Sequence, residues 1–311
     1  MASMKAIRIH QFGDAEQLEL EAIARPVPGR GEMLVRVLAA GVNPVDHKIR
    51  EGQFPPISVG KLPITPGRDI CGEVVAVGDG IASFAIGNRI YAMLGLSHGG
   101  YAEYAVVTAG EAAHAPRTLS PIEAAAVPLA ALTAWQGLFN HGHLTAGQKV
   151  LIHGGSGGVG HFAVQFARMV KAHVTATVSG ADIAFVRALG ADRAIDYQTE
   201  KFETAGPFDL VLDLIGGETQ ERSWSVVKRG GALISTLAEP SQERAAERQA
   251  RATRYMTQPD GRQLAEIARL IDDGQITVAV DTIFELFQAK RAQSYQEGGH
   301  PRGKIVLQVA E

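Results

Sequence analysis

Hydrophobic positions in the first third of the chain come in short runs separated by turn residues. Residues 33–38 and 72–77 are two such runs, with apolar side chains at most positions. Glycine and proline gather around them, at 26–29, 63–67 and 78–80. Short apolar runs bounded by Gly and Pro are typical of strands joined by turns. The pattern therefore predicts a β-rich first part.

Beyond Ser120 the pattern changes to an alternation of strands and helices, and Pro121 marks the first position of a predicted helix. A longer helix is predicted over 161–171, and another begins at Asp182 and ends at Gly190. The apolar stripe of the longer helix consists of Phe162, Phe166, Met169 and Val170. The strands are expected at 149–153, 173–178, 194–197, 208–214 and 232–237. Strands that alternate with helices predict a parallel, doubly wound sheet.

The end of the chain returns to the first domain, with a helix predicted over 263–271 and a last strand over 303–309. The predicted fold class is therefore α/β. A Rossmann domain at 121–265 is inserted into a β-rich domain formed by 1–120 and 266–311.

Composition and charge exclude several classes of protein. Apolar residues make up 46% of the 311 residues and charged residues 20%, which is typical of a globular protein. The net charge of -3 argues against nucleic acid and anionic membrane as partners. The longest apolar run, 124–135, is too short to span a bilayer. The single cysteine, Cys71, favours a cytoplasmic setting, and a small molecule is the expected partner.

A glycine-rich loop carries the strongest chemical signal. Residues Gly155-Ser156-Gly157-Gly158-Val159-Gly160 match the pattern G-x-G-x-x-G after an apolar strand and before a helix. Glycines at these positions let the backbone approach a pyrophosphate, and N–H groups at the helix N-terminus meet its negative charge. In this context the loop predicts dinucleotide binding rather than a surface turn.

The end of the second Rossmann strand bears on the choice between NADPH and NADH. NAD sites place an Asp or Glu there to bind the ribose 2′-hydroxyl. This strand ends Thr177-Val178-Ser179-Gly180, without an acid, and the Ser179 hydroxyl could donate to a 2′-phosphate. Asp182 is interpreted as a helix cap, but it would oppose NADPH if it turned inward. The sequence favours NADPH and leaves NADH open.

Short motifs are spread over almost the whole chain. They are Ala40–Asp46, Pro66–Asp69, Gly99–Tyr104, Leu132–Trp135, the glycine loop, Leu189–Asp192, Ile195–Tyr197 and Arg302–Leu307. In this order the motifs resemble the medium-chain dehydrogenase/reductase (alcohol dehydrogenase-like) superfamily, specifically its zinc-independent quinone oxidoreductase branch. The resemblance implies a GroES-like catalytic domain with an inserted Rossmann domain, and a homodimer.

The resemblance also implies that no catalytic zinc is bound. Zinc-dependent members keep a Cys where this chain has Asn43, and His-Glu where it has Arg68 and Asp69. Because catalytic zinc needs three protein ligands, these differences argue against zinc-assisted alcohol oxidation. His141 and His143 have no carboxylate or Cys near them in sequence and are interpreted as a solvated or locally bonded pair.

The resemblance assigns candidate roles to single residues. Asn43 would orient a substrate oxygen beside the nicotinamide, whereas Asp46 either takes part in catalysis or caps the following helix. Thr133 would reach the nicotinamide. Tyr197 would lie beside the 2′-phosphate or fill the sheet edge, and Lys304 would lie near the cofactor or point to solvent. The other expected cofactor contacts are Gly155, Ser156, Gly157, Gly158, Val159, Gly160, Ser179, Ile215, Leu237 and Arg302.

Together these observations predict hydride transfer from NADPH to an electrophilic acceptor without zinc. The acceptor would be a quinone or the β-carbon of an α,β-unsaturated carbonyl. An enoyl-thioester or 2-alkenal reductase and a non-catalytic NADPH-binding sensor are the alternatives. Two copies of the chain are expected to pair at the edge of the Rossmann sheet near 232–237.

Overall fold

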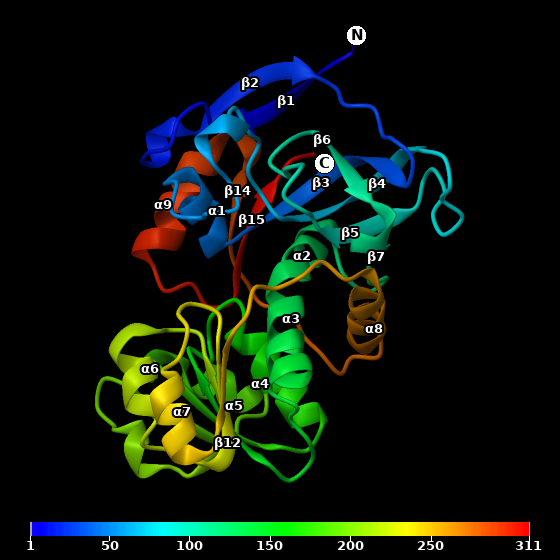
Figure 1. Cartoon of the computed structure of the whole chain (residues 1–311). Helices are drawn as coiled ribbons and strands as arrows, with labels where there is room; N and C mark the ends of the chain where they lie inside the picture. The colour runs from blue at the N-terminus through cyan, green and yellow to red at the C-terminus, as the bar shows by residue number, and fades with distance from the viewer. Residues whose placement is uncertain (1, 311) are drawn as a thin grey trace. The chain divides into compact units, whose positions relative to one another are not determined.

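The computed structural model describes residues 2–310 and divides into two units (Figure 1). Unit 2 is the stretch Thr133–Gln258, and unit 1 is the chain up to Leu132 and from Pro259 onward. The boundaries predicted at 121 and 265 therefore both fall inside unit 1. The helices at Pro121–Ala125 and Gly261–Asp272, which begin inside the predicted Rossmann domain, belong to the β-rich unit 1.

Unit 2 is a six-stranded parallel sheet. Its strands are β8 (Lys149–His153), β9 (His173–Val178), β10 (Arg193–Asp196), β11 (Phe208–Asp213), β12 (Val227–Ser235) and β13 (Arg251–Arg254). Its helices include α4 (Gly160–Met169), α5 (Ile183–Ala188), α6 (Gly217–Ser223) and α7 (Gln242–Arg248). The order β10-β9-β8-β11-β12-β13 corresponds to 3-2-1-4-5-6, the strand order of a Rossmann fold. The predicted doubly wound sheet is confirmed.

One edge strand of this sheet is β13, which the sequence pattern did not predict. Its residues Arg251-Ala252-Thr253-Arg254 are too few and too polar to form an apolar run. Ala232 pairs with Arg251 in a parallel register, so β12 is covered on its outer side. The expectation that 232–237 forms the sheet edge is therefore wrong. The homodimer stays a prediction, and the edge strand next to the predicted segment is β13, with β10 at the opposite edge.

Unit 1 holds a sheet whose order is β14-β15-β3-β4-β5-β7, with β6 also paired to β3, and a separate β1-β2 pair. The strands are β1 (Ser3–Arg8), β2 (Glu19–Ala24), β3 (Glu32–Val42), β4 (Asp69–Val77), β5 (Arg89–Met93), β6 (Tyr104–Thr108), β7 (Ala112–His114), β14 (Val280–Glu285) and β15 (Lys304–Gln308). The helices are α1 (Pro44–Arg50), α2 (Pro121–Ala125), α8 (Gly261–Asp272), α9 (Ala289–Gly298) and most of α3 (Pro128–Trp135). Ile305 pairs antiparallel with Val42, so the end of the chain does return to the first domain.

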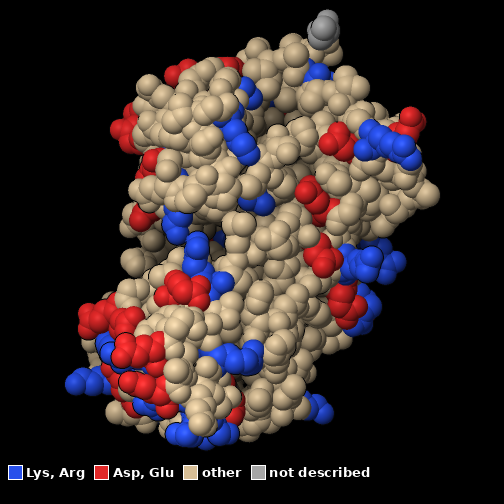
Figure 2. All heavy atoms as spheres, viewed as in Figure 1, with Lys and Arg blue, Asp and Glu red and all other residues tan. Residues whose placement is uncertain are grey.

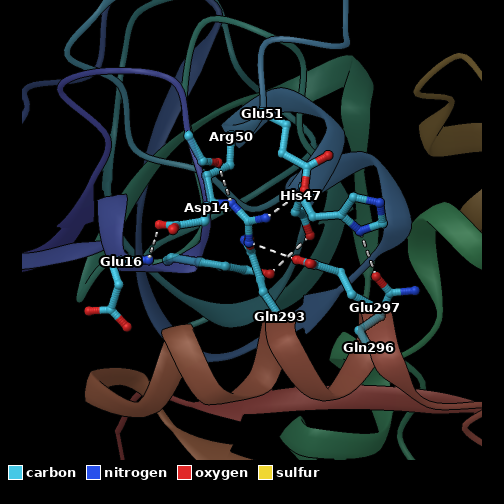
Figure 3. Close-up of polar contacts among 11 residues, drawn as sticks. Asp14, Glu16, His47, Arg50, Glu51, Gln293, Gln296 and Glu297 are labelled. Atoms are coloured by element: carbon cyan, nitrogen blue, oxygen red, sulfur yellow. Dashed lines mark hydrogen bonds and ion pairs between the residues drawn. The ribbon is translucent and has the colours of Figure 1, made fainter.

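Helix α1 is held in place by a buried arginine. The Arg50 side chain is 1% exposed, and its guanidinium donates to the Gly13 carbonyl, to Gln293 Oε1 and to carboxylate oxygens of Glu51 and Glu297 at 2.7–3.1 Å (Figure 3). A guanidinium is tolerated in an interior when its donors are satisfied in this way. The cluster fixes α1 against α9, and thereby fixes the residues at the start of α1.

Acidic and basic side chains lie close together over α6 and α7 (Figure 2), as in the pairs Arg222–Glu203 at 2.6 Å and Arg244–Glu221 at 3.6 Å. Pairs of opposite sign cancel much of each other's field at a distance. Within residues 2–310, every helix is too short or too polar to cross a membrane.

Candidate active site

The glycine loop connects β8 to α4 at the carboxyl end of the Rossmann sheet. A Cβ atom on Gly155 would lie 2.7 Å from the Cβ of Ala176, and one on Gly160 would collide with the carbonyl oxygen of Gly154. A Cβ on Gly157 would meet only that same oxygen, at 3.5 Å. Gly155 and Gly160 are thus required for packing of the strand against the helix, whereas Gly157 leaves its backbone open to a ligand.

Four large apolar side chains line the carboxyl ends of successive Rossmann strands. Tyr197 follows β10, Ile215 follows β11, Leu237 follows β12 and Met256 follows β13, and they are 36–53% exposed. Doubly wound sheets bind dinucleotides at this edge, beside the point where the strand order reverses. The predicted positions of Tyr197, Ile215 and Leu237 suit that role, and Met256 is a neighbour that the sequence did not single out.

The turn that carries Ile215 is shaped by a buried aspartate. Asp213 Oδ1 accepts hydrogen bonds from the backbone N–H groups of Ile215 and Gly216, at 3.0 and 2.8 Å. Asp213 Oδ2 accepts from Gln220 Nε2 and Ser235 Oγ, both at 2.9 Å. Asp213 joins the ends of β11 and β12, and sequence reasoning missed it because its partners lie on separate elements.

The Ser179 hydroxyl is already engaged within the protein. Ser179 Oγ donates to Asp182 Oδ2 over 3.0 Å. Asp182 occupies the predicted N-cap position of α5, but its side chain makes no capping hydrogen bond. The proton expected for a 2′-phosphate is therefore directed to a carboxylate in this structure. Ser179 contributes to NADPH binding only if this hydrogen bond is exchanged.

The Thr133 side chain is 4% exposed and faces residues of its own unit. Its Oγ1 lies 2.7 Å from Thr257 Oγ1, and its carbonyl oxygen accepts a hydrogen bond from the Tyr255 hydroxyl at 2.6 Å. Tyr255 and Thr257 were not anticipated, because the segment after β13 carries no recognisable motif. Contact between Thr133 and the nicotinamide stays a prediction.

His141 and His143 have local partners. His143 Nδ1 lies 3.2 Å from the carbonyl oxygen of Phe139, and the His141 ring packs against the Tyr255 ring with centroids 4.7 Å apart. In the part of the chain that the structure describes, the one group of side chains close enough to share a metal ion is His10, Glu19 and Glu21. The two histidines are therefore placed as the locally bonded pair that the sequence suggested.

His153, at the end of β8, is a fully buried histidine. Its Nδ1 lies 3.0 Å from Thr177 Oγ1 and its Nε2 lies 2.9 Å from Ser223 Oγ. Burial lowers the pKa of His153 to about 4. The ring is therefore neutral at neutral pH, and it ties together β8, β9 and α6 next to the glycine loop.

We expect stability to depend on pH through His153. The unfolded ring takes up a proton near pH 6.5, whereas the native ring resists protonation down to about pH 4. The stabilisation by neutral His153 is therefore present above pH 6.5 and is lost as the pH falls, by about 2 kcal/mol at pH 5. In urea unfolding, the stability difference between wild type and His153→Gln should shrink by that amount from pH 7 to pH 5.

Asp46 provides a control of opposite sign, since burial raises its pKa to about 6. Its stabilising protonated form is lost as the pH rises through the range 4–6. The difference between wild type and Asp46→Asn should therefore change in the other direction over this range. A stability difference for His153→Gln that is the same at pH 7 and pH 5 would contradict the assignment.

In unit 1, Asn43 lies in a buried polar network that involves Lys304 and Asp69, and these three side chains are 0–3% exposed. The Lys304 ammonium donates to Asn43 Oδ1, to the Val42 carbonyl at 3.0 Å and to Asp69 Oδ2 at 3.4 Å. Asn43 Nδ2 donates to Asp69 Oδ2 at 2.8 Å, and Asp69 Oδ1 accepts from the Leu129 N–H at 2.7 Å. The network fixes the orientation of the Asn43 amide and occupies one of its two N–H groups.

Asp46 lies next to this network in the role of a helix cap. Asp46 Oδ2 accepts from the backbone N–H of Asn43 at 2.8 Å and from the Tyr101 hydroxyl at 2.9 Å. A carboxylate at the third helical position that binds the N-cap N–H is half of a capping box. Since Asp46 is 0% exposed, the geometry favours the cap over a direct catalytic role. Tyr101 belongs to the Gly99–Tyr104 motif, but its partner was not foreseen.

Arg302 and Lys304 lie two residues apart and differ in environment. Arg302 is exposed, and its backbone N–H donates to Asp281 Oδ1 at 3.0 Å. Lys304 is 3% exposed, so the alternative that it points to solvent is wrong. Sequence reasoning missed its burial because its partners, Asn43 and Asp69, lie more than 200 residues away in the chain.

A GroES-like β-domain interrupted by a Rossmann domain defines the class of alcohol dehydrogenase-like proteins. Two family models match the chain: an alcohol dehydrogenase GroES-like domain at residues 29–117 and a zinc-binding dehydrogenase domain at 189–307. The first match covers β3 to β7 of unit 1, and the second runs from β10 of unit 2 to β15 of unit 1.

Individual relatives narrow the class. The chain is 32% identical to a chloroplast envelope quinone oxidoreductase homolog of Arabidopsis thaliana, over 98% of both proteins. It is 33% identical to an NADPH-dependent alkenal/one oxidoreductase of the same plant, over 98% of this chain and 79% of the other. The quinone oxidoreductase structure from Coxiella burnetii superposes with a TM-score of 0.92 at 34% identity, covering 99% and 100% of the two chains. The protein belongs to the quinone oxidoreductase branch of the medium-chain dehydrogenase/reductase superfamily.

Proposed function

We propose that the protein is an NADPH-dependent reductase that transfers hydride to a quinone or an α,β-unsaturated carbonyl without zinc. The observation that carries this proposal is the ammonium of Lys304, which is bonded to Asn43 and Asp69. A buried cation already neutralises the carboxylate that a second cation would need, and Asn43 and Arg68 are poor zinc ligands. These residues do not fit a catalytic zinc ion.

NADPH supplies the hydride when it is bound, and the chain supplies position and polarity. We assign pyrophosphate binding to the open backbone at Gly157 and the N-terminus of α4. Asn43, held by Lys304 and Asp69, offers its remaining amide N–H to the oxygen of the acceptor, where negative charge grows during reduction. Because Asp46 and Tyr101 are buried and bonded to each other, water is the proposed proton donor.

A 2-alkenal reductase is the second candidate, because the related Arabidopsis protein is named as an NADPH-dependent alkenal/one oxidoreductase. Both candidates share the cofactor and the site and differ only in the acceptor. A cytoplasmic setting is part of the proposal, supported by a single cysteine, Cys71, that is buried in β4.

The proposal predicts turnover that is independent of metal. Protein treated with a chelator should bind NADPH at least ~10-fold more tightly than NADH, since NAD sites depend on an acid that β9 lacks. NADPH should then be oxidised when 1,4-benzoquinone or 2-hexenal is added. The reaction is measured as the loss of absorbance of the reduced nicotinamide. NADPH binding without turnover on either acceptor would favour the non-catalytic sensor, and activity restored only by zinc would refute the zinc-free mechanism.

A further inference from the structure

Unit 1 contains a cavity of about 270 Å³ that the assigned roles do not use. It is lined by residues of β1 and β2, by the segment 61–68 and by residues 95–106. Apolar side chains form much of its wall, among them Ile49, Ile57 and Leu96. The volume lies just below the range of about 300–1,000 Å³ that is typical for drug-sized ligands, so an occupant would be small.

Three cationic side chains and one histidine line this cavity. They are Arg8, Lys61, Arg68 and His98, and among residues 2–310 no Asp or Glu joins them in the lining. The chain as a whole has more acidic than basic residues, 33 against 30, so this lining is not a reflection of composition. The arrangement selects against cations and favours an anion.

Arg68 is the basic side chain of this lining that is best placed to bind a ligand. It is 8% exposed, and its Nε donates to the carbonyl oxygen of Leu94 at 2.6 Å. Its two terminal nitrogens make no hydrogen bond to any residue in 2–310, although the side chain is buried and faces the cavity. Neither terminal nitrogen is among the fully buried polar atoms that lack a partner, so both remain accessible, and a hydrogen-bond acceptor in the cavity would pair with them.

Nearby carboxylates stabilise the positive charge of Arg68. Burial lowers its pKa, whereas the carboxylates of Asp46, Asp69 and Glu111 act in the opposite direction. An arginine side chain retains its proton under these conditions. Asp69 is bonded to Lys304, so its charge is shared with a second cation. The guanidinium therefore keeps an outward-facing positive edge.

A second arginine contributes at the cavity wall. Arg8 Nη1 donates to Thr65 Oγ1 at 3.2 Å and Arg8 Nη2 to the Pro63 carbonyl at 2.9 Å, while its buried Nε has no partner. His98 lies 3.8 Å from a Glu32 oxygen, which is a weak pairing. Arg8 is held rigidly by the loop and adds positive potential without offering a paired set of free N–H groups.

We propose that this cavity binds a small organic carboxylate with an apolar body, and that Arg68 pairs with the carboxylate through its two terminal nitrogens. Planar guanidinium and carboxylate groups match in a bidentate geometry. A phosphate dianion would need more free donors than one buried guanidinium offers. Since Asp69 follows Arg68 and holds Asn43, the carboxylate would belong to the acceptor itself; this last step rests on the proposed function.

Binding is tested first, without cofactor or turnover. Calorimetric titration of the full-length protein with trans-cinnamate and with uncharged trans-cinnamamide should show at least ~10-fold tighter binding of cinnamate. Arg68→Met should lose this preference, and Arg68→Lys should retain part of it, because a lysine keeps the charge but not the paired N–H groups. Arg117→Met is the matched control: its side chain is 91% exposed, and the preference should be unchanged.

Equal binding of cinnamate and cinnamamide by the wild-type protein, or an unchanged preference in Arg68→Met, would overturn the proposal. If Arg68→Met does not fold, the wild-type preference and its weakening by salt decide the question.

A second experiment tests turnover. The rate of NADPH oxidation is measured with 4-oxo-4-phenylbut-2-enoate as the acceptor and compared with the rate for its methyl ester. Faster turnover of the acid supports an acidic acceptor, whereas an ester that is equally good overturns that step alone. Cinnamate binding without any turnover would refute the proposed function and leave the carboxylate site standing.

Discussion

Replacement of Lys304 by methionine is expected to lower the free energy of unfolding by about 4 kcal/mol. Methionine fills a similar volume but removes the cation bonded to Asn43, Val42 and Asp69. Asp69 is 0% exposed and would be left as a buried charge with too few partners. Urea unfolding of wild type and Lys304→Met at pH 7 measures the effect.

A second variant distinguishes charge from packing. Asp69→Asn in the Lys304→Met background removes the unpaired carboxylate and should recover about half of the lost stability. Lys228→Met is the surface control, since the Lys228–Asp209 pair is solvent-accessible and should contribute less than about 1 kcal/mol. A loss for Lys304→Met no larger than that of Lys228→Met would show that the network does not stabilise unit 1.

Two alanine substitutions in the glycine loop are expected to separate cofactor binding from folding. Gly157→Ala adds a methyl group that meets only the Gly154 carbonyl oxygen, at 3.5 Å, so the fold should tolerate it. The same methyl group would obstruct the approach of a pyrophosphate to the backbone, and the Kd for NADPH should rise by roughly 100-fold. Gly160→Ala instead places a Cβ against the Gly154 carbonyl and should cost about 3 kcal/mol of stability.

Thermal unfolding and NADPH titration of both variants give the comparison. The expected pattern is an unchanged melting temperature with weak binding for Gly157→Ala, and a lowered melting temperature for Gly160→Ala. Gly147→Ala is a poor control because its φ of 78° strains any other residue. Gly110→Ala is better, since a Cβ there meets open space. Tight NADPH binding by Gly157→Ala would mean that the pyrophosphate lies elsewhere.

Much of the Rossmann unit was predictable because its signals are local. The apolar runs at 149–153 and 173–178 coincide with β8 and β9, and the glycine loop lies between β8 and α4 as expected. In unit 1, the helix that starts after Ser120 was predictable for the same reason, since the Ser120 cap depends on a neighbour three residues away. Strand β13 was not predicted, because its four residues begin and end with arginine and show no periodic hydrophobic pattern.

The sequence by itself determined the strand and helix alternation, the dinucleotide loop and the absence of the Cys and His that zinc-dependent relatives keep. These are properties of residue identity or of the spacing between near neighbours, and both can be taken directly from the sequence. Only the tertiary structure decided that Lys304 is buried with Asn43 and Asp69, and that Arg68 faces a basic cavity. Burial and charge pairing depend on which distant segments meet, and a chain read in order does not contain that information.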